Sequence, residues 1–387
     1  MAALPYQGLR VLDLGQGLAG PYCAMLLAQW GADVVKVEPV EGDWLRRIGQ
    51  SWGEHSALSL SANRGKRSIA CDLKQPRALG AVLRIAARCD VVVESFRPGV
   101  MDRLGLGYSV LSQDNPDLIY LSVSGFGQQG VYAQHAGSDS VLQAFSGMMA
   151  LNACELGTPQ RVGFLAVDTL SALYAFQAVA AALFGRKAGH GGQHLDVGLM
   201  QATAAFLAPQ IVGASVRPGD RTPLAVPSGA YRAADGYLTV ALSKEAHFPA
   251  LCRALGREDL AADTRFATFV LRAHNAAELV QTLRDVFVTY PVDECVALLK
   301  FNGLLAGRVN TVEQWLSDPH ASLAVPTHML QGVPDFRLPG IPGVAQPKPG
   351  ELRGAWPGIG GAAAEVLADF GFGTDEALAL VRDGIMA

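Results

Sequence analysis

Asp168 is the residue of this sequence whose surroundings best suit covalent chemistry. It lies between residues 164–167 and the run 170–183, which are largely hydrophobic. Burial in such surroundings disfavours the charged form, so it raises the pKa of the carboxyl and leaves the carboxylate poorly hydrated and reactive. A carboxylate of this kind can act as a nucleophile. The position also suits the N-cap of the helix that follows, and taken alone it is more typical of a cap.

A second candidate is the glycine turn formed by Gly15, Gly17 and Gly20, between a predicted strand and a predicted helix. With Glu38 ending the next predicted strand, its spacing matches the dinucleotide-binding fingerprint. Such a turn lets backbone approach an anionic group at a helix N-terminus, and the pyrophosphate of coenzyme A (CoA) is one such group. Pro21 removes one N–H donor, which weakens the nicotinamide interpretation. A glycine turn that serves only close packing stays open.

Composition indicates a compact enzyme. The chain has 387 residues, of which 50% are hydrophobic and 17% charged, and its net charge of −4 argues against a nucleic-acid partner. The six cysteines include no C-x-x-C pair, so neither a disulfide framework nor a metal site is expected, and a reducing cytoplasm fits them. No basic-then-apolar leader and no uninterrupted apolar stretch of membrane-spanning length is evident, so we expect no membrane association.

These residues need a scaffold, and the hydrophobic pattern predicts an α/β fold. Strands are expected at 10–14, 33–38, 68–72, 90–94, 118–124 and 193–197, and helices at 21–30, 77–87, 99–104, 169–184 and 199–212. This alternation is typical of a Rossmann-like, doubly wound parallel sheet. We expect a large α/β domain at 1–224, completed by 330–387, and a smaller α+β domain at 225–329; the resemblance described next implies that the large domain binds CoA. The large domain is therefore split in sequence.

The order of its motifs makes the chain resemble the class III CoA-transferases, which include formyl-CoA transferase and carnitine CoA-transferase, with α-methylacyl-CoA racemase as a relative. The motifs that carry the resemblance are residues 8–14, 19–21, 31–38, 42–43, 63–68, 72–74, 94–99, 103–107, 115–116, 124–127 and the spacing of Arg161, Gly163 and Asp168. They are dense from about Leu4 to Val212 and thinner beyond.

The resemblance implies that Asp168 is the catalytic carboxylate. In the family this aspartate attacks an acyl-CoA thioester, forms a mixed anhydride, and then carries CoA as an aspartyl thioester before a free carboxylate accepts it. The substrates are thus an acyl-CoA and a carboxylate, and neither a tightly bound cofactor nor a metal is implied. An interlocked homodimer, in which each chain threads through a ring formed by the other, is also implied.

The CoA contacts are carried over by position. They fall on the following residues of this chain: Gly17, Leu18, Cys71, Asp72, Leu73, Lys74, Ser95, Phe96, Arg97, Arg103 and Ser138. The basic members can pair with phosphates, and Phe96 can pack against adenine. Each of these residues also has an interpretation without CoA, because exposed Lys and Arg side chains are usually only solvated and a Phe at a strand end often belongs to the hydrophobic core.

Two departures bear on the reaction. Racemases of this group have a His where Ser138 stands, and His135 lies three residues away on a predicted loop, so transfer is favoured over proton exchange. The glycine loop that covers the aspartate in formyl-CoA transferase is also missing, so the substrates differ from oxalate and formyl-CoA. We favour a short dicarboxylyl-CoA such as succinyl-CoA as donor.

Three functions follow from these patterns. The first is a CoA-transferase, the second an α-methylacyl-CoA racemase or isomerase with the same CoA site, and the third a non-catalytic binding module. A dicarboxylate substrate needs a cation for its far carboxylate, and the candidates are Arg46, Arg47, Arg64 and Arg161. The sequence does not decide among the four.

Overall fold

The computed structural model describes residues 4–153, 157–219 and 225–387, and it divides into two compact units. Unit 1 comprises Met1–Ile211 and Ala324–Ala387, and unit 2 comprises Val212–Leu323. We expected the large domain to end at 224 and to resume at 330. The first division instead falls inside helix α10 (Ala208–Val216), and the large unit resumes at Ala324. The predicted helix 199–212 is also broken, after α9 (Leu199–Phe206).

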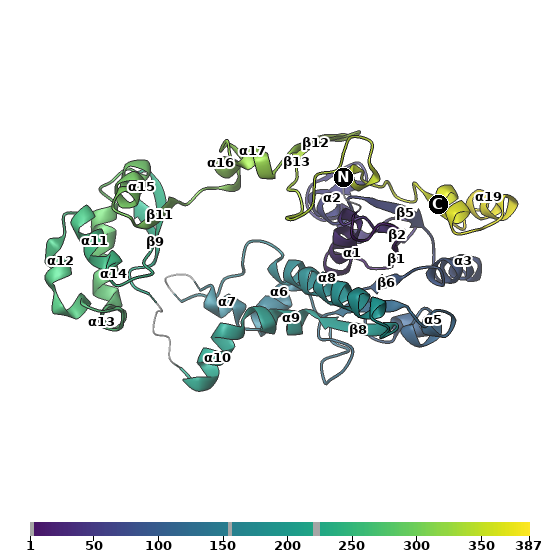
Figure 1. The fold of residues 1–387 in the computed structure, drawn as a ribbon, viewed down its shortest axis with the longest axis horizontal. Helices are drawn as coiled ribbons and strands as arrows, with labels where there is room; N and C mark the ends of the chain where they lie inside the picture. The colour runs from purple at the N-terminus through teal and green to yellow at the C-terminus, as the bar shows by residue number, and fades with distance from the viewer. Residues whose placement is uncertain (1–3, 154–156, 220–224) are drawn as a thin grey trace. The chain divides into compact units, whose positions relative to one another are not determined.

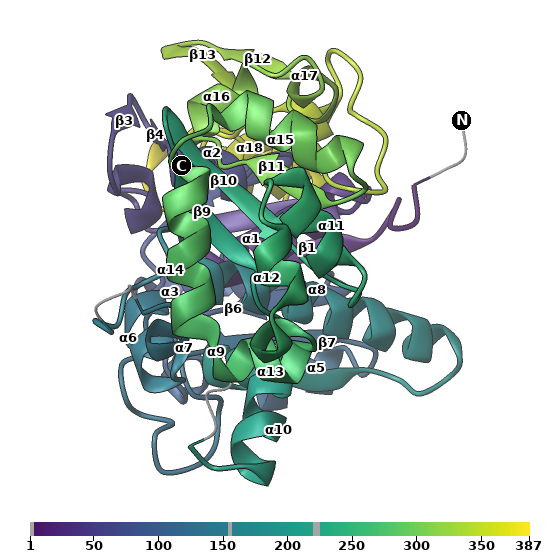
Figure 2. The same ribbon diagram turned by 90° about the vertical axis from the view of Figure 1, so that its left-hand side faces the viewer.

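Unit 1 is built on a parallel sheet of six strands in the order β5-β2-β1-β6-β7-β8. The strands are β1 (Arg10–Asp13), β2 (Asp33–Glu38), β5 (Lys66–Ala70), β6 (Val91–Glu94), β7 (Ile119–Ser124) and β8 (Gln193–Gly198). Figure 2 shows β1, β6 and β7 following one another across the sheet. The predicted α/β class and the parallel sheet are confirmed. Chain order reverses between β1 and β6, which makes this pair the switch point where such sheets bind ligands.

Strand register explains why both faces of the sheet are covered. Val11 pairs with Val34 and Val91, and these three residues belong to one hydrophobic core. Their neighbours Leu12, Val35 and Val92 point to the other face and belong to a second core, because side chains alternate along a strand. A sheet that is covered on both faces needs strands in which nearly every residue is apolar, and the sequence has such strands.

Helices of unit 1 cover the two faces. The first core includes α1 (Ala19–Gln29) and α8 (Ala166–Lys187), and the second includes α3 (Pro76–Ala86) with the carboxyl-terminal α18 (Ala363–Asp369) and α19 (Thr374–Arg382). Figure 1 shows α8 in teal near α1, and these two helices pack directly. The backbone N–H of Ala70 donates to Ala387 O at 2.6 Å, so the carboxyl end pairs with the end of β5.

Helix α8 is long and apolar enough, by length and composition alone, to cross a membrane, and the bent pair α9 and α10 passes the same test together. Core helices of soluble proteins pass this test too. Helix α8 packs against α1, β7 and β8, as a core helix does.

The shorter elements of unit 1 connect this frame. They are η1 (Trp44–Arg47), β3 (Ser51–Trp52), β4 (His55–Ser56), α2 (Ala57–Ala62), α4 (Val100–Arg103), α5 (Tyr108–Asp114), α6 (Asp139–Phe145), α7 (Met148–Leu151), β12 (Thr327–Leu330), β13 (Val333–Arg337) and η3 (Leu352–Gly354). The sequence pattern did not predict β12 and β13, which pair with each other at the start of the proline- and glycine-rich stretch 334–357 and just before it.

Unit 2 is a small α+β body, as expected for residues 225–329. Its antiparallel sheet has the order β11-β10-β9, with β9 (Gly229–Ala233), β10 (Gly236–Ala241) and β11 (Leu305–Arg308). The helices are α11 (His247–Ala254), α12 (Glu258–Ala262), η2 (Thr264–Phe266), α13 (Phe269–His274), α14 (Ala276–Phe287), α15 (Val292–Phe301), α16 (Val312–Leu316) and α17 (Ala321–Ala324). One hydrophobic core joins the sheet to α11, α14 and α15.

Candidate active site

Asp168 lies inside the first turn of α8 rather than at its cap. The helix begins at Ala166, three residues earlier than expected, and its N-cap residue Leu165 has no capping side chain. The capping acceptor is Asp139 of α6, whose Oδ2 accepts hydrogen bonds from the backbone N–H groups of Val167 at 2.7 Å and Asp168 at 3.2 Å. The interpretation of Asp168 as an N-cap is therefore wrong, because a carboxylate distant in sequence already fills that position.

Burial and a like charge act on the Asp168 carboxyl. Desolvation, with a smaller contribution from Asp139, raises the pKa of Asp168 to about 7. Within the part of the chain that the structure describes, no group donates a hydrogen bond to its carboxylate oxygens. An incompletely buried carboxylate with no hydrogen-bond donor is weakly stabilised, and this makes it a good nucleophile.

Helix α6 also fixes the loop that leads to Asp168. Gln143 donates from Nε2 to Asp139 Oδ1 at 2.7 Å and accepts from the backbone N–H of Val162 at 2.9 Å. Asp139 and Gln143 are 3% and 0% exposed. The sequence did not single out either residue for this role, although Asp139 directly follows Ser138, the position where racemases of the group have a histidine.

The glycine turn is occupied by the protein itself. The N–H of Gly15 donates to Asp13 Oδ1 at 3.0 Å, that of Gln16 to Ser95 Oγ at 2.8 Å, and that of Gly17 to both oxygens of Asp43 at 3.2 Å. These donors are therefore unavailable to a pyrophosphate. The acidic residue of the fingerprint is also engaged.

That acidic residue, Glu38, is bound on both oxygens by the guanidinium of Arg46, with an Nη2 to Oε1 distance of 2.6 Å. The arginine and neighbouring groups lower the pKa of Glu38 to about 2, against the opposing effect of burial. A buried carboxylate held in this way is not available to bind a ribose. The dinucleotide fingerprint is thus a structural turn here.

A cavity of about 580 Å³ opens at the carboxyl ends of β1, β2, β5 and β6. It is at the switch point of the sheet, where this class of fold binds its ligands. Six of the eleven residues expected to bind CoA line it: Cys71, Asp72, Leu73, Lys74, Phe96 and Arg103. Gln16 also lines it and was missed by the sequence comparison. Parallel strands bring these residues together because their carboxyl ends meet at one edge.

Comparison with known proteins identifies the family of this chain. The profile of CoA-transferase family III matches residues 6–371. The chain belongs to that family. It is 36% identical over 329 residues to succinyl-CoA–D-citramalate CoA-transferase of Chloroflexus aurantiacus, covering 82% of this chain and 81% of the relative.

A second relative covers nearly the whole chain. Succinate–glutarate CoA-transferase of Agrobacterium fabrum is 33% identical over 381 residues, which is 94% of this chain and 95% of that protein. Among solved structures, a CAIB/BAIF family protein from Brucella suis is 34% identical with a TM-score of 0.83, covering 95% of this chain and all of that one. The resemblance to class III CoA-transferases and the enzyme class, an acyl-CoA:carboxylate CoA-transferase, are thereby confirmed.

The other five residues expected to bind CoA do not line the 580 Å³ cavity at the switch point: Gly17, Leu18, Ser95, Arg97 and Ser138. Ser95 lies next to it, since its Oγ donates to Gln16 O at 2.9 Å. Leu18 is buried in a small cluster with Leu45 and Ala62, against which Leu165 packs. The chain from Gln16 to Leu18 thus runs from the cavity to the start of α8.

The remaining two residues lie elsewhere. Arg97 lines a separate cavity of about 350 Å³ that also contains Glu94, a carboxyl whose pKa burial raises to about 7. Ser138 is exposed at the start of α6 and forms no side-chain cap. His135 is exposed too, and it contacts the rings of Phe126 and Tyr132.

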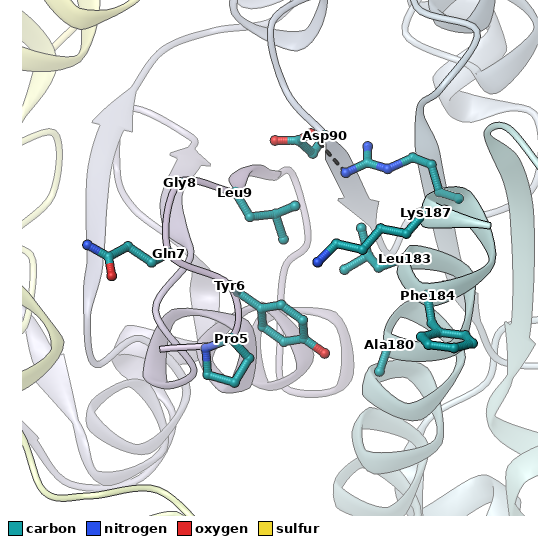
Figure 3. A pocket seen from close by; sticks show the side chains of 11 residues that line it. Pro5, Tyr6, Gln7, Gly8, Leu9, Asp90, Ala180, Leu183, Phe184 and Lys187 are labelled. Atoms are coloured by element: carbon teal, nitrogen blue, oxygen red, sulfur yellow. Dashed lines mark hydrogen bonds and ion pairs between the residues drawn. The ribbon is translucent and has the colours of Figure 1, made fainter. Parts of the chain in front are cut away.

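Another cavity, of about 440 Å³, lies at the opposite ends of the strands (Figure 3). Gly8 and Leu9 precede β1, and Asp90 precedes β6, so this hollow is at the amino ends of the strands. Arg186 forms an ion pair with Asp90 at 3.0 Å, while Lys187 lies in the same wall. It contains none of the residues expected to act in catalysis or CoA binding.

The four arginines considered for a substrate carboxylate differ sharply. Arg46 is bound to Glu38, Arg47 is exposed and donates to Glu41 O at 2.8 Å, and Arg161 is exposed and donates to Ser140 Oγ at 2.9 Å. Arg64 is 1% exposed, and its Nε and Nη1 have no partner among the described residues.

Among the described residues, no group of three or more His, Cys, Asp or Glu side chains is placed to hold a metal ion.

Proposed function

We propose that this family III chain transfers CoA from a short dicarboxylyl-CoA, such as succinyl-CoA, to a free carboxylate through covalent intermediates on Asp168. The observation that carries the proposal is the state of Asp168: a carboxyl with a pKa of about 7, relieved of capping by Asp139, and without a hydrogen-bond donor. The relatives from Chloroflexus and Agrobacterium, whose names specify succinyl-CoA or succinate, support the donor.

The reaction balances without a metal or an external acid. An Asp168 oxygen attacks the thioester carbonyl, the C–S bond breaks, and the CoA thiolate leaves a mixed anhydride. The thiolate then attacks the aspartyl carbonyl and displaces the donor carboxylate, which leaves an aspartyl thioester. The acceptor carboxylate repeats these two displacements in reverse order. One thioester is exchanged for another, so no net proton is taken up.

The CoA moiety is proposed to occupy the cavity at the switch point. Lys74 and Arg103 would pair with its phosphates, and Phe96 would offer an apolar face. From there the chain of Gln16, Gly17 and Leu18 leads to Leu165, three residues before Asp168, and this is the route we propose for the thioester arm.

Trapping tests this proposal directly. Incubation with succinyl-CoA followed by hydroxylamine or borohydride should modify Asp168 alone, as a hydroxamate or a reduced alcohol, in a peptide mass map. A panel of acyl-CoA donors and carboxylate acceptors, read by mass spectrometry, identifies the substrates. Transfer without any adduct on Asp168 would rule out the aspartyl route.

The racemase alternative is disfavoured by one residue. Ser138 stands where racemases of the group have a histidine, and a serine hydroxyl does not exchange protons readily near neutral pH. Incubation of an acyl-CoA in D₂O without an acceptor should therefore leave its α-carbon unlabelled. Deuterium incorporation there would favour the racemase.

An interlocked homodimer is the proposed assembly. Apolar side chains on α8 support an oligomer, since Leu173 and Phe184 are 51% and 78% exposed in the single chain. Linked rings cannot separate while folded, so mass photometry at nanomolar concentration should detect only dimers. A folded monomer would contradict the proposal. A cytoplasmic location stays a prediction.

A further inference from the structure

Arg64 and its neighbour Asn63 carry hydrogen-bond donors that nothing in the described protein satisfies. Five buried side-chain N or O atoms of the described residues lack a partner, and three of them are Asn63 Nδ2 and Arg64 Nε and Nη1. Buried polar groups are nearly always paired, and an unpaired buried charge is especially costly. The concentration of three unmet donors in two consecutive residues therefore requires an explanation.

Among the residues that the structure describes, no carboxylate forms an ion pair with Arg64. The titratable groups that act on it electrostatically are Tyr22 and Arg353, and the pKa of Arg64 is lowered chiefly by burial. Arg64 in turn acts on His328, whose pKa burial lowers. Other buried cations in unit 1 have acidic partners: Lys66 pairs with Asp13 at 2.7 Å. Within the described parts of the chain, Arg64 is thus a buried cation without an anion.

The surroundings of Arg64 can be followed through Tyr22 towards the start of α8. Arg64 follows α2 by two residues, and Ala62 at the end of α2 belongs to the small cluster that contains Leu18. Tyr22 and Leu165 pack against that same cluster, and Leu165 precedes Asp168 by three residues. Arg64 acts electrostatically on Tyr22, one of the side chains that pack against this cluster.

The carboxyl-terminal segment covers this end of α2. The N–H of Gly65 donates to Ala355 O at 2.8 Å, and Trp356 Nε1 donates to Leu60 O at 2.7 Å. An anion bound by Arg64 would be shielded from water there, where a charged, forked hydrogen bond is strongest.

We propose that Arg64 binds the distal carboxylate of a dicarboxylate acyl chain and thereby selects dicarboxylate substrates over monocarboxylates. This inference rests on the proposed function, and it names the group that the sequence left open among four arginines. The planar guanidinium can bind a carboxylate through two parallel hydrogen bonds, and the substrate would supply the anion that the described residues do not.

The test compares two donors that differ at one end. Butyryl-CoA has a methyl group where succinyl-CoA has its distal carboxylate. Arg64→Met should lower kcat/KM for succinyl-CoA by about 30-fold or more, the usual consequence of losing one partner of a buried charge pair. The value for butyryl-CoA should change less than threefold. Arg64→Lys, which keeps the charge and loses the fork, should show a smaller loss.

A stability measurement separates this role from a structural one. Because the Arg64 guanidinium has no partner among the described residues, Arg64→Met should not lower Tm, and free succinate should raise Tm of the wild type more than butyrate does. Arg77→Met, which removes an exposed arginine paired with Asp383, is the matched control and should leave the donor preference unchanged.

The outcomes are distinct. Equal losses on both donors, or a succinyl preference that survives in Arg64→Met and Arg64→Lys, would overturn the assignment while the transferase proposal stands. Loss of the preference in Arg47→Met or Arg161→Met alone would overturn it in favour of that residue. A wild type that transfers CoA from neither donor would overturn the proposed function and this inference together.

Discussion

Replacing Asp168 by Asn should abolish turnover and at the same time stabilise the protein at alkaline pH. The carboxyl has a pKa of about 7 in the folded chain, against an ordinary value near 4 in the unfolded chain. Between these two values the folded state retains a proton that the unfolded state has lost. Stability therefore falls as pH rises from about 4 to about 7, and it stays low above that range.

The size of the effect follows from the shift. Each pH unit between about 4 and about 7 lowers the free energy of unfolding by about 1.4 kcal/mol, so three units lower it by at most about 4 kcal/mol. Partial contact of Asp168 with water reduces this to the order of 2–4 kcal/mol. For a chain of 387 residues that is about 2–5 °C in Tm. Asp168→Asn cannot ionise, so it should melt higher than the wild type by this amount at pH 8.

The assay is thermal unfolding of both proteins at pH 8 and pH 5, alongside the transfer rate. The difference in Tm should shrink by more than half at pH 5, and the variant should lose several orders of magnitude in rate. Asp375→Asn, an exposed first-turn aspartate of α19, is the matched control and should gain no stability at pH 8. The reasoning is refuted if Asp168→Asn is no more stable than the wild type at pH 8.

Three further perturbations test the site. Asp139→Asn should lower the free energy of unfolding by about 1–3 kcal/mol, measured by thermal melting, because an amide supplies one acceptor oxygen where the helix start uses a carboxylate. The same change removes a negative charge near Asp168, so it should move the acidic limb of the kcat/KM profile to lower pH. Lys74→Met should raise KM for acyl-CoA about 5- to 10-fold at low salt, with kcat unchanged and a smaller effect at high salt. Asp13→Asn should lower stability by about 3–5 kcal/mol in denaturant melts, because it leaves Lys66 buried without its partner.

Each of these expectations can fail separately. An unchanged acidic limb in Asp139→Asn would mean that Asp139 does not affect the charge of Asp168. An effect of Lys74→Met on kcat rather than on KM would place this residue outside simple phosphate binding. A stable Asp13→Asn protein would show that Lys66, whose pKa burial lowers to about 8, sheds its proton readily when the partner is removed.

The parts of the fold that depend on local pattern were predictable from the sequence. Strands β1, β2, β6 and β7 are short apolar runs, and their parallel pairing brings their carboxyl ends to one edge. Six of the expected CoA-binding residues gather there for this reason. The break between α9 and α10 was predictable as well, because Pro209 follows Leu207 by two residues, and the expected single helix over 199–212 overlooked this proline.

The parts that depend on contacts distant in sequence were not predictable. Whether Asp168 caps α8 is decided by Asp139, 29 residues away, and the helix consequently begins at Ala166. The glycine turn has the spacing of a pyrophosphate site, but acceptors at Asp43 and Ser95 take its N–H groups. A local motif specifies where donors lie, whereas the rest of the fold decides whether they remain available.

Two carboxylates at one helix start divide two tasks that a single group could not perform together. Asp139 is buried and accepts hydrogen bonds from Val167, Asp168 and Gln143, and these bonds stabilise its negative charge. Asp168 receives no hydrogen bond, and both burial and the neighbouring charge raise its pKa. A capping carboxylate would be held by its donors and would be a poor nucleophile. Because Asp139 supplies the cap, α8 can form while Asp168 keeps the reactive carboxylate that the proposed covalent CoA transfer requires.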